Sequence, residues 1–110
     1  MSDKREKREI LSLPDSFEKF FDELNPVSFT YKSNSSNRKH IGFIAQDVES
    51  ALLAAEIPTS DFAGLVISDG EERIYSLRYE EFIALNTCEI QKLKKRVNEL
   101  ENKLKEIQGE

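Results

Sequence analysis

Polar side chains that could take part in catalysis flank an apolar run in the stretch RKHIGFIAQDVESAL, residues 38–52. Gln46 could donate an amide hydrogen bond to a developing oxyanion, a role that amide side chains fill in other enzymes. His40 could assist proton transfer near neutral pH. The structural alternative is that Gln46 and Asp47 cap the helix that follows and that His40 is an exposed histidine at the end of a strand. The residues alone leave both interpretations open.

The cysteine and histidine content limits the other chemistry. The chain has one cysteine, Cys88, and one histidine. Neither a disulfide nor a conventional zinc site can therefore form within one chain, and the sequence indicates no metal and no cofactor. Cys88 falls at an outward position of the C-terminal repeat described below, so we interpret it as an incidental thiol.

The charge and hydropathy patterns bear on the possible partners. The net charge of −5 argues against a nucleic-acid backbone or an anionic membrane, because both favour a positive excess. No apolar run approaches the roughly 20 residues that span a bilayer, and the first residues are charged. We therefore expect a protein that is made and folded in a cytoplasm and that has no membrane partner.

Helical periodicity appears first in DSFEKFFDEL, residues 15–24, where apolar residues recur at the i, i+3, i+4, i+7 spacing. Asp15 and Glu18 predict a capping box at the start of this helix, and Asn25 with Pro26 predicts its end. A second helix is predicted from Gln46 to about residue 55.

Strand patterns surround these helices. VSFTYK, residues 27–32, alternates apolar and polar residues, whereas HIGFIA, residues 40–45, predicts a strand that is buried on both faces. Gly42 within that run indicates either a close approach of another group to the backbone or a β-bulge. Two strand-like runs in residues 65–77, separated around an Asp-Gly pair, predict a hairpin. The predicted class is α+β, with a small antiparallel sheet and helices packed on it. Six aromatic residues are expected in the core: Phe17, Phe20, Phe21, Phe29, Tyr31 and Phe43.

The last thirty residues follow a different period. The spacing alternates between three and four over more than three heptads, at Ile83, Asn86, Ile90, Leu93, Val97, Leu100, Leu104 and Ile107. This heptad stripe predicts a long coiled-coil helix, with Glu89–Lys94 and Arg96–Glu101 as charge pairs between parallel chains. The alternative is one amphipathic helix folded back on its own domain. The heptads favour an oligomer without fixing whether it is a dimer or a trimer. We place the boundary between an α+β domain, residues 1–80, and the coiled-coil helix, residues 81–110.

Four segments together carry a resemblance to a known family. SDKREKREI, NPVSFTYK, IGFIAQDVE and YSLRYEEFIALNTCEIQKL occur in the order found in the C-terminal intramolecular chaperone domain of bacteriophage tailspikes, tail fibres, neck appendages and endosialidases. GFIAQDVE is the most specific of these motifs. That self-cleaving domain is also similar to one in a membrane-bound myelin transcription factor.

The resemblance implies a homotrimer that holds three upstream fibre or tailspike chains together while they fold and that then cuts itself off. It implies a catalytic Ser2 with Lys7 as its base, an apolar residue at Ile10, and a cleavage point at Ser2 and Asp3. The upstream chain would attach where Met1 stands. The domain would act in the cytoplasm of a bacterial host during phage assembly and would be absent from the mature virion. In this setting Gln46 would orient the cleaved backbone or its oxyanion, and His40 would assist proton transfer.

A serine–lysine pair can react only if the lysine is neutral and lies close to the serine hydroxyl. A serine hydroxyl needs a base, and a lysine with an ordinary pKa of about 10.4 must be desolvated or crowded by cations to serve as one. Lys4, Arg5 and Arg8 could supply that crowding. Five residues of regular helix would place Ser2 and Lys7 on different sides, because each residue turns about 100°. We therefore expect either a non-helical start or a neighbouring chain to join the pair.

Two other functions compete with a self-cleaving chaperone. One is a non-catalytic oligomerisation domain that registers the strands of a fibre. The other is a nucleic-acid-binding dimer that uses the basic cluster at Lys92, Lys94, Lys95 and Arg96. The negative net charge and the absence of aromatic residues within that cluster make the last function the weakest.

Overall fold

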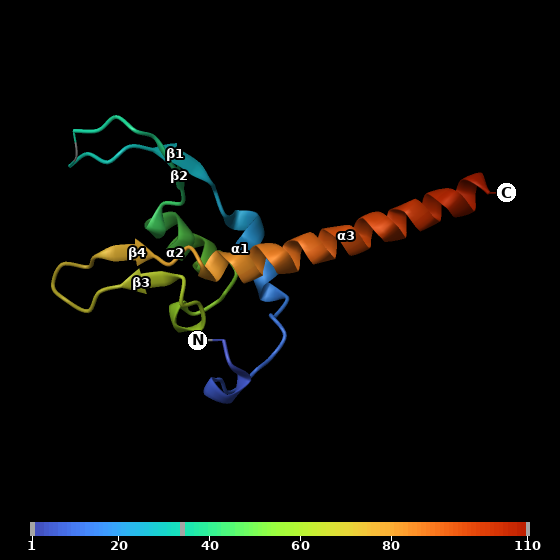
Figure 1. Cartoon of the computed structure of the whole chain (residues 1–110), viewed down its shortest axis with the longest axis horizontal. Coiled ribbons are helices and arrows are strands. Elements are labelled where there is room, and N and C mark those ends of the chain that lie inside the picture. Colours follow the sequence, from blue (N-terminus) through green and yellow to red (C-terminus); the bar gives the residue numbers. More distant parts are fainter. Residues whose placement is uncertain (1, 34, 110) are drawn as a thin grey trace.

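The computed structural model describes residues 2–33 and 35–109 and shows a folded body from which one long helix projects (Figure 1). Met1, where an upstream chain would attach, and Asn34, in a polar connection, lie outside the described residues. The elements in chain order are η1 (Lys4–Glu6), α1 (Ser16–Glu23), β1 (Val27–Phe29), β2 (His40–Gly42), α2 (Ala45–Ala54), η2 (Thr59–Asp61), β3 (Leu65–Ile67), β4 (Tyr75–Leu77) and α3 (Glu81–Gln108). The predicted α+β class with a long C-terminal helix is confirmed.

Helix α1 forms where the periodicity predicts it, but its start differs from the prediction. Asp15 has helical backbone angles and its side chain makes no capping hydrogen bond, so the predicted capping box is wrong. The main chain begins the helix instead. The N–H of Phe17 donates to the carbonyl of Pro14 at 3.1 Å, and the N–H of Glu18 donates to the carbonyl of Asp15 at 3.0 Å. These bonds already satisfy N–H groups that a capping side chain would serve.

The strands pair as two separate antiparallel ribbons. In the first ribbon Val27 faces Gly42 and Phe29 faces His40. In the second, Leu65 of β3 faces Leu77 of β4, which confirms the predicted hairpin. Its connection is longer than a two-residue Asp-Gly turn, because seven residues, 68–74, separate the strands.

The hydroxyl of Ser68 organises this connection. It accepts a hydrogen bond from the N–H of Ile74 at 2.9 Å and donates one to the carbonyl of Glu72 at 3.0 Å. A serine side chain thus supplies the bonds that a tight turn would have made in the backbone.

The β1–β2 ribbon is much less buried than its sequence predicts. Ile41 is 86% exposed, Ile44 40% and Tyr31 53%. The prediction that residues 40–45 form a strand buried on both faces is therefore wrong, as is the placing of Tyr31 in the core. A strand buried on both faces needs packed layers above and below it, and this ribbon extends from the body with its outer face uncovered (Figure 1).

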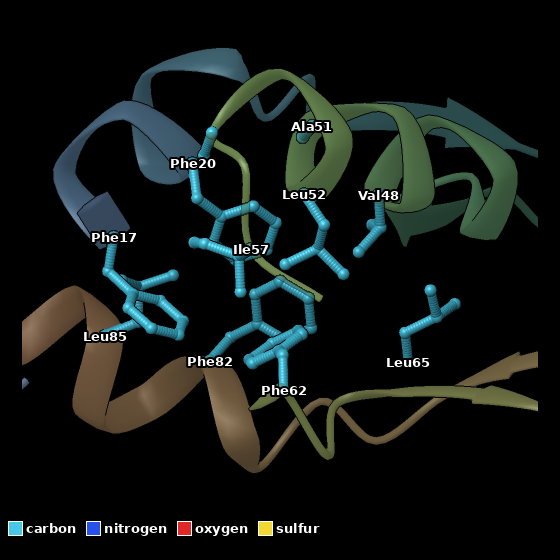
Figure 2. Close-up of a cluster of buried hydrophobic side chains, with 11 residues drawn as sticks. Phe17, Phe20, Val48, Ala51, Leu52, Ile57, Phe62, Leu65, Phe82 and Leu85 are labelled. Carbon is cyan, nitrogen blue, oxygen red and sulfur yellow. The ribbon is translucent and has the colours of Figure 1, made fainter. Parts of the chain in front are cut away.

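The core lies where α1, α2 and the first turns of α3 meet. Phe20 and Leu52 have no exposed surface, and Val48 has almost none. Phe62, from a loop, and Phe82, from α3, complete an aromatic cluster around Phe20, with ring centroids 5.0 Å apart for Phe20–Phe62 and 5.2 Å for Phe62–Phe82 (Figure 2). Of the predicted core aromatics, Phe17 is also buried, while Phe21, Phe29 and Phe43 are half-buried.

Helix α2 ends in a left-handed residue. Glu56 has φ 58°, its N–H donates to the carbonyl of Leu53 at 3.0 Å, and the N–H of Ile57 donates to the carbonyl of Leu52 at 2.9 Å. This is a Schellman arrangement, in which glycine is the residue most often found at the left-handed position. Leu52 and Ile57 are both buried, so the motif also turns the chain into the core.

Helix α3 has 28 residues, which at about 1.5 Å per residue extend about 42 Å. Only its first turns pack on the body, through Phe82, Leu85 and Glu89. The rest of α3 projects beyond the body (Figure 1), and the apolar residues of the heptad stripe are exposed, so the alternative of a helix folded back on its own domain is wrong. None of the described helices is long and apolar enough to cross a bilayer.

Candidate functional site

The N-terminal segment that carries Ser2 and Lys7 is organised by Asp3. The Asp3 side chain accepts hydrogen bonds from the Arg5 N–H at 2.9 Å and from the Arg5 guanidinium at 2.8 Å. The guanidinium bond first, and the backbone bond second, hold the pKa of the Asp3 carboxyl below its ordinary value. The result is a non-helical start followed by one 3₁₀ turn, which is the first of the two alternatives considered for joining Ser2 and Lys7.

Ser2 and Lys7 do not form a dyad within the described part of one chain. Both side chains are exposed, and neither takes part in a hydrogen bond or ion pair among residues 2–33 and 35–109. The backbone of Lys7 is extended and closes the 3₁₀ turn through its N–H, which donates to the carbonyl of Lys4 at 3.1 Å. The non-helical start therefore does not by itself bring the two side chains together.

Gln46 lies in the first turn of α2, but it does not cap that helix. The N-cap residue is Ile44, and no side chain makes a capping hydrogen bond there, so the capping role considered for Gln46 and Asp47 is wrong. Gln46 is exposed and lines a cleft of about 540 Å³ between the two ribbons. The amide is thus available to a molecule or chain that enters the cleft.

His40 belongs to an aromatic cluster on the β1–β2 ribbon. Its ring stacks on Phe29, with centroids 5.7 Å apart, and meets the Tyr31 ring edge-on at 5.0 Å. Phe29 and Tyr31 also line the cleft that contains Gln46. The structure therefore brings the neighbourhoods of His40 and Gln46 together, whereas the segment with Ser2 and Lys7 lies on the opposite side of the body (Figure 1).

Tyr79 joins the GFIAQDVE motif to the start of α3, a role that was not predicted from the sequence. Its hydroxyl accepts a hydrogen bond from the N–H of Phe43 at 3.1 Å, and its ring stacks on Phe43 with centroids 6.2 Å apart. A Cβ atom at Gly42 would collide with the Tyr79 hydroxyl, which confirms the close approach predicted at this glycine. The glycine within an apolar run was the only signal of this contact.

Three polar residues that connect the β3–β4 ribbon to α2 were also not predicted from the sequence. The Tyr75 hydroxyl donates to Glu49 Oε1 at 3.1 Å, and Arg73 lies 3.7 Å from Glu49 Oε2 and 5.4 Å from the centre of the Tyr75 ring. These residues tie the β3–β4 ribbon to α2. No motif pointed to them, because their pairing depends on how the hairpin lies over the helix.

Helix α3 presents the heptad stripe to solvent. Its seven apolar members are 51–73% exposed: Ile83, Ile90, Leu93, Val97, Leu100, Leu104 and Ile107. Asn86 is exposed in the same stripe. Fully burying one such side chain would be worth about 1.5–3 kcal/mol, so the stripe is an exposed apolar surface of unusual extent.

The neighbouring Glu89 does not take the position predicted for it. It is 6% exposed, and its Oε2 lies 3.5 Å from Lys92 Nζ while accepting no hydrogen bond within the described residues. Partial burial lowers the pKa of Lys92, but the charge of Glu89, with smaller contributions from Cys88 and Glu18, raises that pKa above its ordinary value overall. In this fold Glu89 is paired within its own chain and not displayed toward Lys94 of another.

Comparisons with known proteins agree with this architecture. A solved structure of a novel intramolecular chaperone superposes with a TM-score of 0.72 and covers 86% of this chain and 99% of its own, at 20% identity. That likeness establishes the fold: an α+β body with a projecting C-terminal helix. Among curated proteins, no relative matches this chain.

A family model identifies the class to which this fold belongs. The model described as chaperone of endosialidase matches residues 2–57, just over half of the 110 residues. The matched region contains Ser2, Lys7, His40 and Gln46. The chain belongs to the chaperone of endosialidase family, a peptidase family, as its motifs predict.

Proposed function

We propose that this chain is an intramolecular chaperone that assembles as a homotrimer through α3, supports the folding of an upstream β-structure and then releases itself by cutting near Ser2. The observation that carries the proposal is the exposed heptad stripe on a helix that projects from the folded body (Figure 1). The resemblance of the motifs to trimeric fibre chaperones supports three chains as the number. Three identical helices joined along this stripe would hold three upstream chains in register.

The cleavage step can be written from the residues of this chain. The Ser2 hydroxyl attacks the carbonyl carbon of the scissile peptide bond while Lys7, in its neutral form, takes the hydroxyl proton. The C–N bond then breaks, the proton passes to the leaving amine, and water hydrolyses the resulting ester. Gln46 would donate to the oxyanion and His40 would assist proton transfer, which requires that another chain bring the cleft of one copy beside the N-terminal segment of its neighbour.

The positions of the residues within one chain support this trans arrangement. Ser2 and Lys7 are on an exposed segment, and Gln46 lines the cleft between the two ribbons. In Figure 1 the N-terminal segment lies on the side of the body opposite the β1–β2 ribbon. A site completed only by a neighbour would make cutting depend on assembly. A chain cut before assembly would lose the device that holds it to the other two.

We further propose that the partner is a fibre or tailspike segment of the same polypeptide, folded in the cytoplasm of a bacterial host during phage assembly. After the cut the domain would be absent from the mature virion. The second candidate, a non-catalytic oligomerisation domain, is favoured by the lack of any hydrogen bond joining Ser2 to Lys7 within the described residues.

Expression with an upstream fibre segment separates these two candidates. The self-cleaving chaperone gives two bands on a denaturing gel, and Ser2→Ala and Lys7→Ala each give one uncut band. Ser12→Ala and Lys19→Ala, which are the same changes outside the proposed site, still give two bands. A single uncut band from the unmutated chain would leave only the oligomerisation domain.

The same assay tests the cleft. Gln46→Glu keeps the size of the side chain and removes its donors, so cleavage should slow about 10²-fold or more if the amide serves the oxyanion. His40→Ala should slow it as well. Unchanged rates in both variants would remove the cleft from the mechanism and leave Ser2 and Lys7 in place.

A further inference from the structure

Two grooves flank the heptad stripe at the level where α3 leaves the body. The first lies between the end of α1 and α3 and has a volume of about 600 Å³. It is lined by Phe21, Asp22, Leu24, Pro26, Phe43, Asn86 and Ile90. The second lies on the other side of α3 and is lined in part by Leu13, Ile83 and Thr87. We call the first the α1 groove.

The α1 groove is continuous with the stripe. Asn86 and Ile90 belong both to the wall of the groove and to the predicted coiled-coil seam. A helix packed on the seam at this level must therefore also approach Phe21 and Leu24. The interface between copies consequently extends from α3 onto the folded body.

The charge pattern identifies which residue of the second copy approaches. In a parallel coiled coil the residue five positions beyond Glu89, which is Lys94 of the neighbouring copy, comes to the side where Glu89 stands. Here α1 covers that side, and Glu89 is buried and paired with Lys92. Two carboxylates of α1 are exposed near this side of the stripe: Glu18, whose charge acts on Lys92 of the same chain, and Asp22, which lines the α1 groove.

Asp22 of one copy and Lys94 of a second copy are both available for a contact between copies. Asp22 and Lys94 are exposed, and neither makes an ion pair among residues 2–33 and 35–109. Helical side chains lean toward the N-terminus, so the ammonium of Lys94 reaches back to the level of Glu89 and of the groove. Charge complementarity and continuity with the seam thus point to the same occupant.

We propose that the α1 groove of each copy receives α3 of a second copy of this chain, with Lys94 of that copy paired to Asp22. This inference rests on the proposed assembly through α3 and adds the contact that couples the assembly to the folded body. It also explains why α1 leaves an apolar groove open beside the seam. The groove is completed when the neighbouring helix arrives.

A charge-swap cycle tests the pairing by sedimentation equilibrium of the full chain. Asp22→Lys and Lys94→Asp should each weaken trimer association about 10-fold or more, because three copies of the pair are lost at once. The double variant should return to within a few-fold of the unmutated chain. Both positions are exposed, so circular dichroism should show an unchanged fold.

Matched controls come from the adjacent residues. Glu23 is exposed but does not line the groove, and Lys95 falls at an outward heptad position. Glu23→Lys should leave association nearly unchanged, and Lys95→Asp should not rescue Asp22→Lys.

A failure of the groove pairing and a failure of the proposed assembly give different results. If Asp22→Lys and Lys94→Asp have independent effects or none, while Val97→Asp in the seam still dissociates the trimer, the groove pairing is wrong and the proposed assembly stands. If the unmutated chain is a monomer, the assembly itself is wrong and the groove pairing fails with it.

Discussion

Gly42→Ala is expected to destabilise the chain because of one specific contact. The added Cβ would collide with the Tyr79 hydroxyl and approach the Tyr79 Cζ at 3.1 Å and a Phe29 ring carbon at 3.4 Å. Gly42 has no positive φ, so the effect is steric and not conformational. The Tyr79 ring must move, and the hydrogen bond from the Phe43 N–H is lost with it.

The magnitude follows from these two terms. Overpacking of this kind costs about 1–3 kcal/mol, and a lost hydrogen bond about 1 kcal/mol. Since Tyr79 is 46% exposed and can shift outward, we expect Gly42→Ala to lower the free energy of unfolding by about 1–2 kcal/mol. Tyr79→Phe alone should lower it by about 1 kcal/mol.

The double variant provides the decisive comparison. With the hydroxyl gone, the clash at Gly42 is reduced, so the combined loss should be smaller than the sum of the two single losses by about 0.5 kcal/mol or more. Urea unfolding followed by circular dichroism, at one fixed chain concentration, measures all three values. Gly70→Ala is the control, because a Cβ there meets only ordinary contacts at 3.8 Å and beyond. Strict additivity, or an equal loss in Gly70→Ala, would refute the contact.

Three further predictions concern the turn, the N-terminal segment and the core. Glu56→Gly should raise the free energy of unfolding by a few tenths to about 1 kcal/mol in thermal melts, because Glu56 holds a left-handed conformation; a lower melting temperature would contradict this. The folded pKa of Asp3 is depressed, so its bonds to Arg5 persist above the ordinary pKa and are lost as pH falls through the folded pKa; the Arg5 amide resonance should titrate with a midpoint below 3.8, and a midpoint at or above it would oppose the assignment. Leu52→Ala should destabilise by about 2–5 kcal/mol in urea unfolding while Leu53→Ala, at a 79% exposed position, changes little; equal effects would be inconsistent with the core.

Local periodicity was enough to predict the helices. The spacing of Phe17 and Phe20 predicted α1, and the heptads predicted both α3 and the exposure of its stripe. Both patterns arise within one element, so the sequence contains them completely. Periodicity did not predict the second, shorter buried face of α3, to which Phe82 and Glu89 belong. That face has no long repeat of its own, and its burial depends on how α3 packs on the body.

Burial of the strands could not be predicted in the same way. The apolar run that contains Ile41 and Ile44 fits a buried strand, yet the number of layers around a strand is a property of the whole fold. The candidate site shows the same contrast between local features, which could be predicted, and long-range contacts, which could not. Gly42 signalled a close contact, while its partner Tyr79 lies 36 residues later in the chain and was visible only in the structure. The proposed approach of Ser2 to the cleft of a second copy would depend on the assembly, which a single sequence does not place.

The most direct test of the account is the mass of the purified chain in solution, measured by sedimentation equilibrium over a wide range of concentrations. The account predicts a species three times the 12.7 kDa of one chain, which Val97→Asp converts to single chains without unfolding the body. A mass of one chain at the highest concentration would contradict assembly through α3, and with it the conditional cleavage at Ser2.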